Sequence, residues 1–176
     1  MSLTLEFHTD KEYGDLGLWL TERVKRDTRM AYLRALRETA KWFAEQFTDT
    51  VSEQTRIQRD VVAKRVSMSK GRATITVTAR VSPVRARDLG PLTQLKPGAK
   101  AGNFYFHKSF VAVMNARRGP SIYRRKGRPR FPVSEQGIAI ELSALKAAKD
   151  LSARLSAYYE ARWKHHRETQ GGADDA

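Results

Sequence analysis

The chain has 176 residues and no cysteine, and its 33 Lys and Arg against 19 Asp and Glu give a formal net charge of +14. A chain of this length can fold as one domain without a disulfide or a bound metal, and the lack of cysteine excludes thiolate chemistry and a cysteine-based zinc site. No apolar run approaches the roughly 20 residues that cross a bilayer, and residues 1–10 lack the pattern of a signal peptide, so we expect a soluble protein without membrane contact.

The positive charge is concentrated in the middle of the chain. Residues 61–134 contain 17 Lys and Arg but a single acid, Asp88, so this segment carries +16 and the rest of the chain about −2. Such a field attracts polyanions, which favours contact with nucleic acid phosphates or with an acidic protein surface. The alternative interpretation is a generic basic surface that only keeps the protein in solution.

The N-terminal part predicts a short strand followed by helices. Leu3, Leu5 and Phe7 alternate with polar residues, as in a strand. Residues 15–50 predict one long helix, or two with a break, because apolar residues recur every three or four positions. The stripe of the second half is Leu33, Leu36, Ala40, Phe43, Phe47 and Val51. Ser52 is expected to cap a second helix that runs to about residue 63.

A change to period two indicates an antiparallel sheet in the middle of the chain. Val66 and Met68 alternate with polar residues, a turn follows at 70–71, and residues 73–81 alternate again, so the two segments predict a hairpin. We predict that residues 91–102, with two prolines and two glycines, form an exposed and mobile loop. Apolar segments at 104–114 and 122–123, and an alternation at 138–142, complete the strands.

The last part predicts a C-terminal helix. Ser143 is its expected cap, and the helix is expected to fade near residue 169. Its predicted inward stripe is Leu145, Ala148, Leu151, Leu155 and Tyr158. The fold class is therefore α+β, with a long N-terminal helix, a mostly antiparallel central sheet and a C-terminal helix packed on the sheet. We expect one domain over 1–169 and a flexible polar tail over 170–176.

The sequence contains no convincing active site. His165 and His166 are adjacent on a predicted helix and point to different sides, and His107 has no carboxylate nearby in sequence to orient it. No nucleophile motif, Walker-type loop or dinucleotide glycine pattern is present, and the central segment lacks the clustered acids of a two-metal nuclease. We therefore expect a protein that is not an enzyme and that has no catalytic residues, no cofactor and no metal.

One segment has a weak similarity to a base-stacking strand. Residues 102–107, Gly-Asn-Phe-Tyr-Phe-His, combine aromatic residues with a glycine but lack the full spacing of an RNA-recognition module. Aromatic side chains next to Arg or Lys can stack nucleobases. Ordinary packing in a sheet is the more frequent role of such residues, and both interpretations stay open.

A longer stretch resembles the bacteriophage minor tail protein Z family. The stretch consists of Phe110-Val111-Ala112-Val113-Met114, Gly119, Ile122-Tyr123-Arg124-Arg125, Arg128 and Arg130-Phe131-Pro132-Val133. Upstream, the helical segment with Arg34, Ala35, Leu36 and Thr39-Ala40, and residues 56–65 running into a strand, are also similar to that family. The resemblance covers roughly residues 28–133, with 86–102 not aligning clearly, and it contains no catalytic signature.

The resemblance implies a tail-completion factor. Such a protein is a structural component of the virion and is assembled in the host cytoplasm. The resemblance implies that it forms a homo-oligomeric ring, expected to be hexameric, at the head-proximal end, or neck, of the tail tube. It finishes tail assembly and permits head-tail joining, beside the DNA. The implied partners are other phage tail and neck proteins, namely the tail tube, the tail terminator and the head-tail connector, together with non-specific contact with DNA.

The residues expected to act in this role fall into two groups. The predicted DNA- or partner-facing basic surface consists of Arg117, Arg118, Arg124, Arg125, Lys126, Arg128 and Arg130. The predicted interface loop contributes Leu95, Lys96, Lys100 and Phe104. Two alternatives stay open: a stand-alone nucleic-acid-binding module, which the +16 segment favours, and another neck component such as a tail terminator or head-tail connector.

Overall fold

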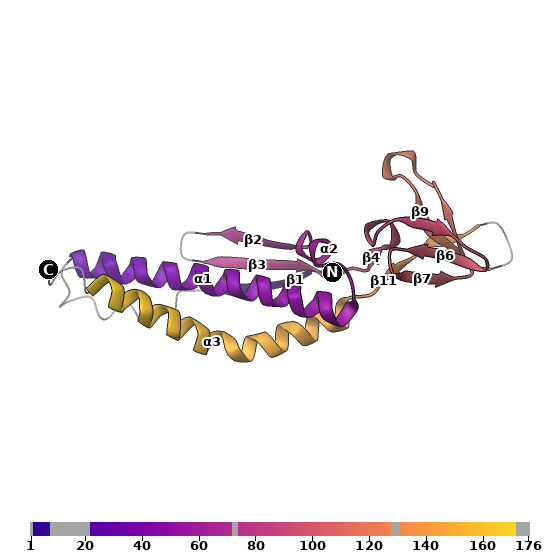
Figure 1. Cartoon of the computed structure of the whole chain (residues 1–176). Coiled ribbons are helices and arrows are strands. Elements are labelled where there is room, and N and C mark those ends of the chain that lie inside the picture. Colours follow the sequence, from indigo (N-terminus) through magenta and orange to yellow (C-terminus); the bar gives the residue numbers. More distant parts are fainter. Residues whose placement is uncertain (1, 8–21, 72–73, 128–130, 172–176) are drawn as a thin grey trace.

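The computed structural model describes residues 2–7, 22–71, 74–127 and 131–171, and these form an elongated molecule with two parts (Figure 1). We call the helical part with its sheet the stem, and the β-rich part, residues 84–138, the head. The stem consists of β1 (Ser2–Phe7), α1 (Glu22–Thr55), α2 (Arg59–Ala63), β2 (Val66–Lys70), β3 (Ile75–Arg80) and α3 (Glu141–Gly171). The chain passes from stem to head after β3 and returns before α3.

The head is built from short strands. Its elements are β4 (Val84–Arg85), η3 (Ala86–Asp88), β5 (Leu92–Gln94), β6 (Gly98–Ala101), β7 (Phe104–His107), β8 (Ser109–Ala112), η4 (Ala116–Arg118), β9 (Ser121–Arg125), β10 (Val133–Glu135) and β11 (Gly137–Ile138). They form two three-stranded sheets, of order β5-β6-β7 and β10-β9-β8, and the pair β11-β4. Every pairing in the described residues is antiparallel. The α+β class is therefore confirmed.

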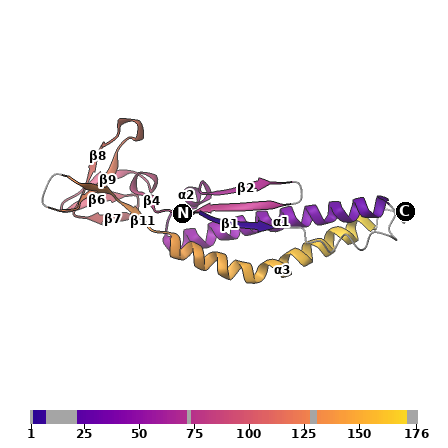
Figure 2. The ribbon, with the colours of Figure 1, turned by 180° about the vertical axis from the view of Figure 1, so that it is seen from behind.

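In the stem, α1 lies between a three-stranded sheet and α3. The helices α1 and α3 run side by side in opposite directions in both views (Figures 1 and 2). The sheet has the order β1-β3-β2, so the predicted hairpin of β2 and β3 is confirmed and β1 joins its far side. On β3 the apolar residues Ile75, Val77 and Ala79 are buried and alternate with more exposed threonines. This alternation is what a sheet with one face on a helix requires.

The buried face of α1 follows the predicted stripe. Its buried members are Leu36, Ala40, Phe43, Phe47 and Val51, each at most 3% exposed, whereas Leu33 is half-buried. These side chains belong to one apolar cluster that also includes the inward residues of β3. The helix continues to Thr55, and Arg56 then takes a left-handed conformation with φ 57°, which ends a helix.

Two predicted helix caps are wrong. Ser52 lies inside α1, and its hydroxyl donates to the carbonyl oxygen of Ile57 at 2.7 Å, so α2 begins after Gln58 instead. Ser143 lies inside α3, which begins at Glu141 and extends to Gly171. Of the alternation predicted at 138–142, only Ile138 lies in a strand, the last residue of β11. In each case the serine that was expected to precede a helix as its cap lies within a helix.

The predicted inward stripe of α3 is partly wrong. Leu151 is buried and Ala148, Leu155 and Tyr158 are half-buried, but Leu145 is 44% exposed. The alanines Ala144 and Ala147 are buried in its place. Small side chains at these positions let the first turns of α3 pack closely, which an assignment based on large apolar residues does not anticipate.

The predicted loop at 91–102 is also wrong, because these residues form the hairpin of β5 and β6. Ala99 and Ala101 are fully buried, and the side-chain amide of Gln94 donates to the carbonyl oxygens of Leu95 and Gly98 at 3.0 and 2.8 Å across the turn. Small residues allow this hairpin to lie close to neighbouring backbone. A Cβ on Gly102, which has φ +54°, would collide with the carbonyl oxygen of Leu89.

Candidate functional site

Within residues 110–133, the described residues lie in the sheet β10-β9-β8 and in the connections between its strands. The connection between β8 and β9 projects from the head (Figure 1). It carries Arg117 and Arg118 of η4, both exposed, together with Val113 and Met114, which are 59% and 43% exposed. The Asn115 side chain accepts from the backbone N–H of Arg117 at 3.0 Å and caps η4. The projection therefore presents guanidinium groups beside apolar side chains.

The other predicted basic residues lie at the end of β9. Arg124 and Arg125 are exposed, and as neighbours in a strand they extend from opposite faces of the sheet. The guanidinium carbon of Arg125 lies 5.7 Å from the ring centre of Phe110, a cation–π contact. Lys126 follows the strand and is exposed, and Arg128 and Arg130 lie outside the described residues. The predicted basic surface is therefore distributed over a projection and two faces of one sheet.

The four predicted interface residues lie on the sheet β5-β6-β7. Leu95 and Lys96 form the exposed turn between β5 and β6, and Lys100 is exposed on β6. Phe104 on β7 is half-buried and packs against the core, so it stabilises the head. Only three of the four side chains are therefore accessible to a partner.

A carboxylate that sequence analysis did not single out holds the head together. One oxygen of Glu135 accepts from the Ser121 hydroxyl at 2.7 Å and from the Arg87 guanidinium, and its other oxygen lies 3.7 Å from Nε of Arg85. Burial opposes ionisation of Glu135, but the hydrogen bonds from Ser121 and Arg87 and the charges of Arg87 and Arg85 outweigh it and lower its pKa. We call these four residues the Glu135 clasp.

The clasp supports the projecting connection. Arg87 also donates to the carbonyl oxygen of Arg118 at 2.7 Å, at the end of η4. The next residue after Glu135, Gln136, accepts from the N–H of Ala86 at 3.0 Å and donates its own N–H to Ile122 at 2.8 Å. This backbone position joins the pair β11-β4 to the sheet β10-β9-β8. Arg87 and Glu135 therefore position the base of the basic projection.

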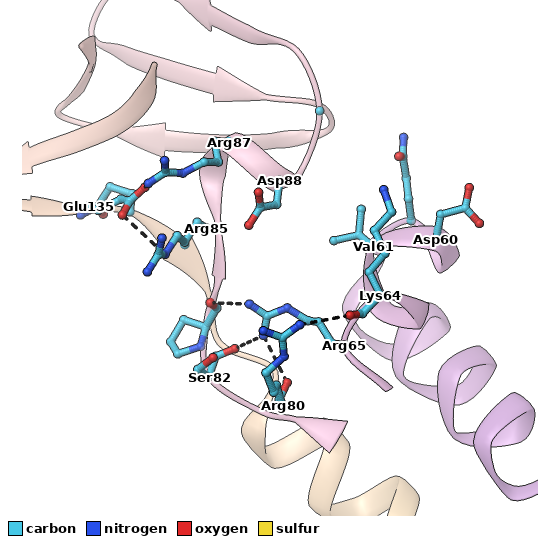
Figure 3. A pocket seen from close by; sticks show the side chains of 15 residues that line it. Asp60, Val61, Lys64, Arg65, Arg80, Ser82, Arg85, Arg87, Asp88 and Glu135 are labelled. Atoms are coloured by element: carbon cyan, nitrogen blue, oxygen red, sulfur yellow. Dashed lines mark hydrogen bonds and ion pairs between the residues drawn. The ribbon is translucent and has the colours of Figure 1, made fainter. Parts of the chain in front are cut away.

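Between stem and head lies a polar cleft of about 980 Å³ (Figure 3). Its charged lining residues are the cations Lys64, Arg65, Arg80, Arg85 and Arg87 and the acids Asp60, Asp88 and Glu135. Arg65 donates to the carbonyl oxygens of Arg80, Ser82 and Pro83 at 3.2, 2.5 and 3.1 Å. Burial and the neighbouring charge of Arg80 lower the pKa of Arg65. These hydrogen bonds fix Arg65 to residues 80–83, the segment where the chain leaves the stem. We call this region, where intramolecular hydrogen bonds connect stem and head, the joint.

The sequence offered only a partial signal for these residues. Glu135 is the first acid after a run of 46 residues that contains none, which marks it as a partner for the surrounding arginines. The register that brings Glu135 to Arg87 and Ser121 depends on the head topology, which no local pattern predicts. Within the described residues, no group of three His, Asp or Glu side chains is arranged to hold a metal, and no helix is long and apolar enough to span a bilayer.

Comparison of the chain with protein-family models, with curated proteins and with solved structures gave no match.

Proposed function

We propose that this chain is a structural subunit of a long-tailed bacteriophage that completes the tail at its head-proximal end and permits head-tail joining. In this proposal it is not an enzyme, and it works in the virion as a homo-oligomeric ring beside the tail tube, the tail terminator or the head-tail connector. The resemblance of roughly residues 28–133 to the minor tail protein Z family motivates the proposal. The observation that carries it is the projection from the head, which combines Arg117 and Arg118 with Val113 and Met114.

A projection of this composition suits docking to a protein neighbour. Exposed apolar side chains supply contact area, and arginines are enriched in protein interfaces and also bind phosphates. The clasp holds the projection at its base through the Arg118 carbonyl oxygen, so it is presented in a defined direction. Such pre-organisation lowers the entropic cost of assembly.

The stem sheet offers a second means of assembly. In the part of the chain that the structure describes, β1 and β2 are edge strands, because β3 lies between them. Each leaves one row of backbone N–H and C=O groups without a strand partner, which a neighbouring subunit can pair with. A subunit with two open edges is suited to head-to-tail contacts, the kind that close into rings.

The proposal is tested by reversing charge on the projection in the phage or prophage that encodes the chain. We expect Arg117→Glu with Arg118→Glu to leave the protein folded and to stop head-tail joining, so that heads and tails accumulate separately in electron micrographs. The matched control, Lys146→Glu with Lys149→Glu, makes the same charge change at exposed positions of α3 and is expected to give infectious particles. Normal infectious yield from the projection variant would contradict the proposal.

A further inference from the structure

The outer face of the sheet β5-β6-β7 brings together residues from three strands. The register places Lys100 between Thr93 and Tyr105, and Gly98 opposite His107. All of these except Gly98 are exposed, whereas Ala99, Ala101 and Phe106 on the opposite face are buried. The face is therefore a solvent-facing surface with an aromatic ring at one edge.

Gly98 leaves space for the side chain of Tyr105. A Cβ built on Gly98 would lie 2.8 Å from the Tyr105 hydroxyl oxygen and 3.0 Å from Cζ, so the hydroxyl end of the ring lies next to the glycine. Tyr105 is nevertheless 49% exposed. The His107 ring lies beside it, with centroids 6.5 Å apart and planes at 49°. An exposed tyrosine ring on a sheet surface can stack with a nucleobase.

Exposed lysines lie on the strands and turns of this sheet, and carboxylates are missing from the same part of the chain. Lys100 is the cross-strand neighbour of Tyr105, Lys96 lies in the turn after β5, and Lys108 follows His107; all three are exposed. From residue 89 to residue 134 the sequence contains no Asp or Glu. The charge of this face therefore complements a phosphate backbone.

We propose that this face binds single-stranded nucleic acid, with a base stacked on Tyr105 and adjacent phosphates held by Lys100 and its neighbouring lysines. An aromatic platform combined with flanking cations is the usual arrangement for sequence-tolerant binding of single strands. A duplex keeps its bases stacked inside and offers this surface only phosphates. The site lies on a different sheet from the projection, and the inference does not depend on the tail role.

The test is fluorescence anisotropy of labelled 12-nucleotide oligo(dT) and oligo(U), and of the matching oligo(dT)·oligo(dA) duplex, with the full-length protein. We expect Tyr105→Ala to weaken binding of both single strands about tenfold and to change duplex binding less than about twofold. Tyr105→Phe keeps the ring and is expected to bind like the parent. Lys100→Gln is expected to weaken binding and reduce its salt dependence, whereas the control Lys149→Gln on α3 is expected to change neither.

A crosslinking experiment keeps the inference testable if a variant fails to fold. An oligonucleotide with 5-iodouracil is irradiated with the unmodified protein, and the adduct is mapped by mass spectrometry. We expect the crosslink at Tyr105 or at His107 beside it. Crosslinks confined to other residues would overturn the inference, as would a Tyr105→Ala variant that binds single strands like the parent or loses single-strand and duplex binding in parallel.

Discussion

The stem and the head are stabilised by different interactions. The stem buries long apolar side chains of α1, such as Phe43 and Phe47, against Val77 on β3 and against α3. The head has short strands whose buried residues include several alanines, and it places a buried serine and the Glu135 clasp where the strands meet. Both parts bury apolar residues, Ile122 and Phe106 among those of the head, but the head combines this burial with a few polar contacts of specific geometry.

This difference matches what each part is proposed to do. The stem, whose described edge strands β1 and β2 are proposed to contact neighbouring subunits, has a core formed by α1, α3 and β3. The head, residues 84–138, contains 12 Lys and Arg and two acids, so it carries +10 of the net charge of +14. These positive charges repel one another, and specific partners offset part of that repulsion. In the head, Glu135 and the carbonyl oxygen of Arg118 are such partners for Arg87.

The largest expected effect comes from the stem core. Phe43→Ala removes a ring that is 3% exposed, and we expect it to lower the free energy of unfolding by about 3–5 kcal/mol, because it leaves a cavity in a continuous core. The measurement is urea denaturation followed by circular dichroism. The control Val113→Ala, at a 59% exposed position of the projection, is expected to change stability by less than about 0.5 kcal/mol. A similar loss for both variants would remove the distinction between core and projection.

Local patterns predicted the stem better than the head for a physical reason. The α1 stripe and the β2-β3 hairpin follow periods of 3.6 and 2 that are visible in the sequence, because each element has one apolar and one polar face. The head strands are two to five residues long, too short for a period to emerge, and its prolines and glycines resemble those of a loop. The loop expected at 91–102 is a hairpin because Ala99 and Ala101 are buried beside backbone, a tertiary effect.

The predicted site was recovered only in part for a similar reason. The acid-poor segment 61–134 covers most of the head as well as β2 and β3 of the stem. In the head, Arg117, Arg118, Arg124, Arg125 and Lys126 are all exposed. Their division between a projection and two faces of one sheet follows from strand register and not from spacing along the chain. The roles of Arg87 and Glu135 require two residues 48 positions apart to meet, which a single sequence does not reveal.

The clasp gives an intermediate effect that depends on pH. Glu135→Gln removes the negative charge that Arg87 and Arg85 contact. We expect this change to lower the free energy of unfolding by about 1–3 kcal/mol at pH 7. Because the pKa of Glu135 is lowered in the folded state, its stabilising contribution is present above the ordinary value of 4.5 and is lost as the pH falls through the lower, folded-state value. The difference between parent and variant is therefore expected to shrink below about pH 4.5, whereas the effect of Phe43→Ala stays nearly constant.

The measurement is denaturation of the parent and of Glu135→Gln at several pH values between about 3 and 7. Glu45→Gln is the control, because Glu45 makes an exposed pair with Lys41 at 3.8 Å on α1 and is expected to contribute less than about 0.5 kcal/mol. If Glu135→Gln is as stable as the parent at pH 7, the clasp does not hold the head and the comparison between the two parts fails.

The smallest expected effect concerns the joint between stem and head. Arg65→Lys keeps the positive charge but loses the planar fork that reaches the carbonyl oxygens of Arg80, Ser82 and Pro83, because a lysine ammonium cannot reproduce that geometry. We expect a loss of only about 1 kcal/mol in global stability, since these groups are partly exposed to water. Local opening of the joint is expected to rise more, because residues 80–84 then have fewer contacts that fix them to α2 and β2.

Hydrogen exchange separates these two effects. Faster exchange confined to residues 80–85 in Arg65→Lys, with α1 and β3 residues 75–79 unchanged, would show that Arg65 fixes the direction of the head and contributes little to either core. The control Arg37→Lys alters an exposed arginine on α1 and is expected to leave exchange in the joint unchanged. Uniformly faster exchange in both parts would instead mean that stem and head unfold as one unit, and the joint would then be an extension of the stem core.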